Sequence, residues 1–216
     1  MLTIDSLTFD LTNCELRKAD PNSRAWLSSD IVAHLLRFRE GPPSWNFDLR
    51  NPQAAKDFYG QQCEENAGAM LFNEVFPIAG HEALCGVFKY RAPAPNNMAM
   101  LYVGIIWIPF ANYNYQLNVE AMEQGTTGTR EAGVMLMEPE LFPEQPDAPV
   151  VAVKSAEEMF VRMKAAKVRA LPSDDMRFDT KFPDHPLSLV RKRLGEIIDT
   201  IKLNANGEVL APFRIS

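Results

Sequence analysis

The chain has 216 residues, and its 22 Lys and Arg against 28 Asp and Glu give a net charge of -6 at pH 7. With 46% hydrophobic and 23% charged residues, the composition is that of a folded globular protein and excludes a disordered or collagen-like chain. The acidic balance and the lack of a dense basic stripe argue against a nucleic-acid partner.

No segment predicts a membrane span or a secretion signal. The longest apolar run, residues 98–110, is shorter than the roughly 20 residues of a membrane helix, and a glycine and a proline interrupt it. The three cysteines, Cys14, Cys63 and Cys85, form no close pair, which fits a reducing compartment. The sequence therefore predicts a soluble, cytoplasmic protein that does not insert into a membrane.

The N-terminal third of the chain predicts strands followed by a helix. Apolar residues within 2–11 indicate one or two edge strands, and residues 31–38 indicate another strand. Asn51 followed by Pro52 is typical of a helix N-cap with proline at the first helical position. We expect this helix over residues 52–66.

Residues 69–123 predict the centre of the fold. Apolar and polar residues alternate in 113–121, and residues 101–108 are apolar on both alternating faces, as in a strand covered on both sides. In 84–90, Leu84, Gly86, Phe88 and Tyr90 alternate with Cys85, Val87 and Lys89, which adds a third strand. A weaker alternation in 70–78 adds a fourth strand. Because every connection is only a few residues long and cannot hold a crossover helix, we expect a four-stranded antiparallel meander.

Three helices are expected after the meander. A short one is predicted over residues 130–137, and a capping box that begins with serine predicts another over 155–167. The last helix starts at residues 184–186, and its apolar residues recur at spacings of three and four as far as Ile201.

The fold class that follows is α+β: one domain in which a mostly antiparallel sheet is packed by helices. Residues 1–138 form the α/β sandwich core in this prediction. Residues 139–216 add an extended crossing and C-terminal helices that pack on the same domain. The extended crossing is inferred from the spacing of Pro139, Pro143, Pro146 and Pro149.

The order of strand, helix, antiparallel meander and helix over residues 1–138 resembles the α/β/α sandwich of the PsbP-like and Mog-type proteins. Residues 76–84, 108–110 and 123–131 are also similar to segments of bacterial proteins, a similarity that implies kinship without chemistry. The PsbP-like resemblance implies a protein that acts by binding other proteins and has no shared catalytic set. It therefore transfers no catalytic residue to this chain.

The segment most like a ligand site is the turn before the helix at 130–137. It consists of Gly125, Thr126, Thr127, Gly128, Thr129 and Arg130. Two glycines permit close backbone approach, three hydroxyls can donate, and a helix N-terminus with an adjacent arginine can hold an anion. The competing interpretation is commoner: the glycines turn the chain, the threonines cap the helix and Arg130 pairs with a carboxylate.

Aromatic residues supply a second candidate site. Trp45 and Phe47 lie in a loop-like stretch, and Tyr113 and Tyr115 follow a proline turn. Exposed rigid aromatic side chains are typical anchors of protein interfaces. The alternative is that they form a satellite core beneath a long loop.

The remaining reactive residues predict neither catalysis nor metal binding. His34 lies in an apolar run and is expected in the core or at its edge, and Cys85 is expected to be a small buried thiol. The acidic residues within 174–185 match no calcium loop, so we expect a solvated loop that ends in a helix cap at Asp184. The sequence also lacks a nucleophile elbow.

These patterns leave three hypotheses for function. The leading one is a non-enzymatic protein-binding or adaptor module, with a protein partner, no cofactor and no metal. The alternative is an enzyme or binding protein for an anionic small molecule, which is held by the turn at residues 125–131. In the third, an apolar strand edge completes a homo-oligomer.

Overall fold

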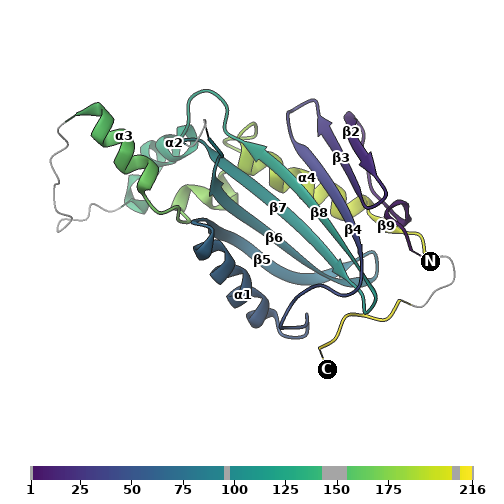
Figure 1. Cartoon of the computed structure of the whole chain (residues 1–216). Coiled ribbons are helices and arrows are strands. Elements are labelled where there is room, and N and C mark those ends of the chain that lie inside the picture. Colours follow the sequence, from purple (N-terminus) through teal and green to yellow (C-terminus); the bar gives the residue numbers. More distant parts are fainter. Residues whose placement is uncertain (1, 95–97, 143–154, 206–209, 216) are drawn as a thin grey trace.

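A computed structural model describes residues 2–94, 98–142, 155–205 and 210–215. The large sheet consists of β2 (Cys14–Asp20), β3 (Ser23–Ser28), β4 (Ala33–Glu40), β5 (Ala69–Ile78), β6 (His81–Arg91), β7 (Met100–Pro109) and β8 (Tyr113–Met122). Its seven strands are antiparallel neighbours in the order β2-β3-β4-β8-β7-β6-β5 (Figure 1). A second, small ladder pairs β1 (Leu7–Thr8) with β9 (Lys202–Leu203). Four helices pack on this framework within the described residues, so the α+β fold class is confirmed.

The predicted meander is confirmed as β5, β6, β7 and β8, each paired with the next. The strand expected at 31–38 is β4, and it lies on the other side of β8. The edge strands expected within residues 2–11 shrink to β1, since Ile4–Ser6 form a 3-10 turn whose first residue is buried. The hairpin of β2 and β3 completes the sheet at its far edge.

One face of the sheet carries α1 (Pro52–Glu65), close to the predicted range. The side chain of Asn51 accepts the N–H of Ala54, which gives the expected N-cap. Tyr59 and Cys63 of α1 pack against Phe88 and Trp107 of the sheet and form a small second core. This core anchors the helix beneath the β5 side of the sheet (Figure 1).

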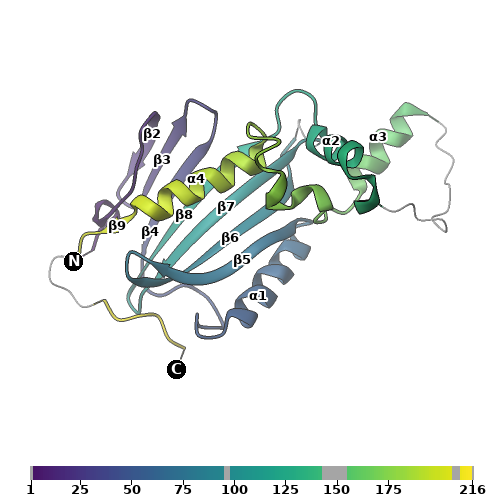
Figure 2. The ribbon, with the colours of Figure 1, turned by 180° about the vertical axis from the view of Figure 1, so that it is seen from behind.

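The opposite face carries α4 (Pro186–Thr200), which lies across β7 and β8 (Figure 2). Its buried apolar stripe includes Leu187, Val190, Leu194 and Ile197, the residues whose spacing predicts the helix. The helix sits close on the strands at Gly104, where an added Cβ would lie 2.5 Å from Leu194 Cδ1. The C-terminal helix is therefore integral to the main core.

Two further helices, α2 (Thr129–Met137) and α3 (Ala156–Ala165), lie at one end of the sheet (Figure 1). Both agree closely with the predicted ranges. Pro139 begins a short 3-10 helix, Pro139–Leu141, whereas the rest of the predicted crossing, with Pro143, Pro146 and Pro149, lies outside the described residues.

Candidate functional site

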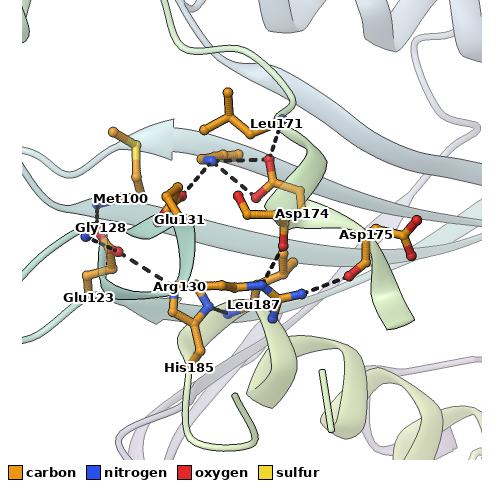
Figure 3. Close-up of polar contacts among 12 residues, drawn as sticks. Met100, Glu123, Gly128, Arg130, Glu131, Leu171, Asp174, Asp175, His185 and Leu187 are labelled. Carbon is orange, nitrogen blue, oxygen red and sulfur yellow. Dashed lines mark hydrogen bonds and ion pairs between the residues drawn. The ribbon is translucent and has the colours of Figure 1, made fainter. Parts of the chain in front are cut away.

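Charged side chains from four segments meet inside the protein, at the end of the sheet next to α2 (Figure 3). Lys89 comes from β6, Glu123 follows β8, Glu131 lies on α2, and Asp174 ends the 3-10 helix Pro172–Asp174. Lys89 and Asp174 are only 2% and 5% exposed. Because buried charges are costly unless paired, the partners of each group decide what this cluster can do.

Lys89 is the centre of a first network. Its ammonium donates to both carboxylate oxygens of Asp174 at 3.1 Å and to Oε1 of Glu131 at 3.3 Å. Asp174 also accepts the N–H of Leu171 at 2.9 Å. These bonds fasten the segment that precedes α4 to strand β6.

Arg130 is the centre of a second network and is completely buried. Its Nε donates to the carbonyl of Ser173 at 2.6 Å, and Nη1 donates to Ser188 Oγ at 2.7 Å. Nη2 donates to the carbonyl of Asp175 at 2.9 Å and to Asp179 Oδ1 at 2.8 Å. All three nitrogens are committed inside the protein, so Arg130 cannot supply the cation that the anion hypothesis requires. The carboxylate pairing of the competing interpretation is present.

Glu123 organises the turn from which α2 starts. Its Oε1 accepts the N–H of Gly128 at 3.0 Å, and its Oε2 accepts the N–H of Met100 at 2.8 Å. Burial acts to raise the pKa of Glu123, but the neighbouring ring of His185 and the hydrogen bonds from the N–H groups of Gly128 and Met100 outweigh it and hold the pKa below its ordinary value. A carboxylate thus occupies the helix end where an external anion would bind.

The turn glycines have the predicted role, and the threonines do not. Gly125 and Gly128 adopt left-handed φ angles of 68° and 71°, which favour glycine. Gly128 is the N-cap residue of α2, and it offers no side chain that caps the helix. The expected threonine caps at Thr126, Thr127 and Thr129 are replaced by the carboxylate of Glu123.

Glu123, Glu131 and His185 each turn one possible metal ligand toward a common point, with these atoms within 4.8 Å of one another. The hydrogen bonding of His185 and the charge of Lys89 argue against a bound metal ion. His185 Nδ1 accepts the N–H of Leu187 at 3.2 Å, so the neutral ring carries its proton on Nε2, the nitrogen 3.6 Å from Glu123 Oε1. A metal-binding histidine instead donates its second N–H to a protein acceptor. The ammonium of Lys89 beside Glu131 also repels a cation.

Tyr102 shows that the chemistry of this cluster is that of an anchor. The residue is fully buried, and its hydroxyl has no hydrogen-bond partner among the described residues. Burial, aided by the charges of Glu131 and Asp174, raises the pKa of Tyr102 far above its usual value. The hydroxyl therefore stays protonated at neutral pH. The bonds of Lys89 and Arg130 position α2 and the segment before α4 on the sheet.

Asp174 and Asp179 of the segment at 174–185 are packed, which corrects the expectation of a solvated loop for these two acids, whereas Asp175 and Asp184 are exposed. Asp174 and Asp179 each accept from buried or half-buried cations of other segments. The N-cap of α4 is His185 through Nδ1, and not Asp184. The carboxylates are drawn inward because Lys89 and Arg130 need counter-charges in the interior.

The four aromatic residues of the predicted interface also require correction. Phe47 is 4% exposed and Tyr115 is completely buried, so the satellite-core alternative holds for Phe47 and the sheet core contains Tyr115. Trp45 donates its Nε1–H to Tyr59 Oη at 2.8 Å, and Tyr113 is half-buried against the main core. They stabilise the fold and do not form a free aromatic patch.

The residues predicted as inert are buried. His34 is 2% exposed, and burial lowers its pKa. Cys85 is also 2% exposed, and burial raises the pKa of its thiol to about 12, which leaves it a poor nucleophile. The expected buried thiol is confirmed.

A mainly apolar groove lies beside α4, and it is lined by residues of α4, β5 and β6 and by the segment 170–177. Its volume is about 610 Å³, within the range of ligand and peptide pockets. The floor includes Cys85 and Val87 of β6, and Phe72 and Phe76 of β5 form the strand side. Ile198 contributes to the helix side. The groove exists because α4 covers β7 and β8 and leaves this part of the sheet without a helix.

Gly195 lies in the interior of α4 and lines this groove. A Cβ added there would meet nothing within 4 Å, and its φ is not in the left-handed region. Glycine inside a helix costs about 0.5–1 kcal/mol relative to alanine. Neither close packing nor backbone conformation requires a glycine here, so its effect is to leave open space on the groove side of α4.

Sequence reasoning misses the groove because its lining residues come from elements far apart in the chain. Leu71 and Phe76 of β5 and Ile198 of α4 are ordinary apolar positions of their own elements. One local signal was available: Gly195 lies in the interior of the last helix, where a glycine lowers helix stability and often has a packing or functional reason.

Searches against protein-family models and against curated proteins find no match to this chain. Within the residues that the structure describes, no helix is both long enough and apolar enough to cross a bilayer.

Proposed function

We propose that this protein is a non-enzymatic binding module that receives an apolar, helical segment of a protein in the groove beside α4. The observation that carries the proposal is the combination of an open groove of about 610 Å³ with a helix-interior glycine on its wall. Natural proteins seldom expose a continuous apolar surface without a binding role.

The shape of the groove favours a helix as the bound segment. Residues of α4, of β5 and β6, and of the segment 170–177 line it, so a helix laid beside α4 would extend the second layer over β5 and β6. Helices pack at axis separations of about 8–10 Å, and a small residue such as Gly195 permits the closer end of this range.

The chemistry of the groove favours binding over catalysis. Its thiol, Cys85, has a raised pKa, and Lys89 of the neighbouring buried cluster is ion-paired with Asp174 and Glu131. The resemblance in element order to PsbP-like proteins, which act mainly by binding proteins, agrees with this proposal. The free state of Cys14, Cys63 and Cys85 fits the reducing cytoplasm, where we place the protein.

Substitutions at Gly195 test the proposal without loss of the fold. Gly195→Leu has room for its side chain and fills the groove, whereas Gly195→Ala keeps the groove open and should raise stability by about 0.5–1 kcal/mol. We expect affinity capture with the immobilised full chain to retain a protein with the wild type and Gly195→Ala, and to lose that protein with Gly195→Leu. Capture of the same proteins by all three variants would contradict the proposal.

A further inference from the structure

We propose that helix α3 of a second copy occupies the groove, so that two chains associate by reciprocal exchange of this helix. The inference rests on the proposed function, because it requires the groove to accept a helix. It goes further by identifying a specific occupant, which is a helix of the chain itself.

Helix α3 exposes three apolar side chains that belong to neither hydrophobic core cluster of the described residues. Met159, Phe160 and Val161 are 41%, 48% and 65% exposed. None of the helix residues whose side chains are described is buried. A helix of ten residues is marginally stable in water by itself, since most helix stability in proteins comes from packing of an amphipathic face. The exposed apolar side chains of α3 are therefore available to pack against a partner.

A single short helix such as α3 suits the groove. Ten residues span about 15 Å, and a single helix beside α4 is what the uncovered part of the sheet lacks. Phe160 and its apolar neighbours would enter the space in front of Gly195, where an added Cβ meets nothing within 4 Å. The groove and the helix thus both expose apolar surface, and each can bury the surface of the other.

Charge complementarity supports the same occupant. Glu74 lies on β5 between Phe72 and Phe76, and it is exposed without an ion-pair or hydrogen-bond partner among the described residues. Lys164, near the end of α3, is an exposed cation without a recorded partner in the same part of the chain. A helix seated in the groove can bring this ammonium to the Glu74 carboxylate at the rim.

The anchoring of α3 favours a second copy over the same chain. The carbonyl of Ala166 accepts from Arg91 at 2.9 Å, and Val168 is only 5% exposed. These contacts hold the C-terminal end of α3 to the β6 side of the body, while the helix itself projects from the end of the sheet (Figure 1). Docking in its own groove would break them, whereas docking in a neighbour keeps them. Two reciprocal contacts close as a two-fold dimer.

The test measures the oligomeric state of the full-length chain by analytical ultracentrifugation over a range of concentrations. The wild type should form a dimer. Gly195→Leu blocks the groove, and Phe160→Asp places a charge where α3 would enter it. Each should therefore raise the dimer dissociation constant at least tenfold. Because each of these variants keeps one intact half of the interface, an equimolar mixture should form a dimer that neither variant forms alone.

Two controls separate this exchange from general adhesion. Leu136→Ser removes the most exposed apolar side chain of α2, at 85% exposure, and should leave the dimer unchanged. Glu74→Lys and Lys164→Glu should each weaken the dimer several-fold, and the double variant should recover affinity because the pair is restored with reversed signs.

A wild type that stays monomeric at every concentration would overturn the exchange, as would a dimer that survives both Gly195→Leu and Phe160→Asp. If a captured protein still depends on an open Gly195 groove while the chain is monomeric, only the exchange fails. If Gly195→Leu changes neither capture nor association, the groove itself is not a docking site.

Discussion

Replacement of Lys89 by methionine tests whether the buried charged cluster anchors the fold. The ammonium is 2% exposed and lies 3.1 Å from both oxygens of Asp174 and 3.3 Å from Glu131. Methionine fills similar volume but leaves the Asp174 carboxylate, at 5% exposure, without its counter-charge. Loss of one partner from a buried pair costs about 3–5 kcal/mol, a large part of the 5–15 kcal/mol that stabilises a typical domain.

Urea unfolding measures this loss through the midpoint at an unchanged slope. The matched control is Lys192→Met, since Lys192 is 68% exposed and its carboxylate partner lies 3.9 Å away, so its loss should stay below about 0.5 kcal/mol. In Lys89→Met with Asp174→Asn, the loss should be about 1–3 kcal/mol smaller than the sum of the two single losses. A loss for Lys89→Met no larger than that of the control would refute the anchoring role.

Three further predictions follow from particular contacts. The folded-state pKa of Glu123 is lowered, so its contribution to stability is fully present above the unfolded pKa near 4.5 and disappears as pH falls through the folded pKa. Glu123→Gln should therefore cost about 1 kcal/mol of unfolding free energy at pH 7, and this cost should vanish in acid. A cost that stays constant with pH in urea unfolding would contradict this. Gly104→Ala should cost about 1–3 kcal/mol, because the new Cβ would lie 2.5 Å from Leu194, and an unchanged melting temperature would exclude this clash. Ellman's reagent should label half-exposed Cys14 in the native protein and Cys85 only after unfolding; equal native rates would mean that Cys85 is accessible.

The strands and helices that bury a regular apolar face were predictable. Strand β8 and helix α4 show periods of two and 3.6 residues because the core selects one side of each, and β7 is apolar on both faces because it is covered on both sides. The hairpin of β2 and β3 lacked this signal. Most of β2 is exposed at the sheet edge, so no alternation of apolar and polar residues marks it.

The site residues were harder to predict because their partners are distant in sequence. Lys89 and Asp174 are separated by 85 positions, and no local pattern joins them. Arg130 was singled out for its helix terminus, but its burial depends on Asp179 and on the packing of the segment before α4. Tyr115 is different: its place on the apolar parity of its own strand already indicated the core, and the proline turn before it was given too much weight.

The most direct test of the groove is methyl NMR of the full-length protein during titration with the apolar probe 8-anilinonaphthalene-1-sulfonate. We expect saturable shifts at the groove methyl groups of Val87, Leu194 and Ile198, and their loss in Gly195→Leu. Shifts confined to other surfaces, such as exposed Leu136 of α2, with the groove methyl groups unchanged, would contradict the assignment of the groove as the binding site.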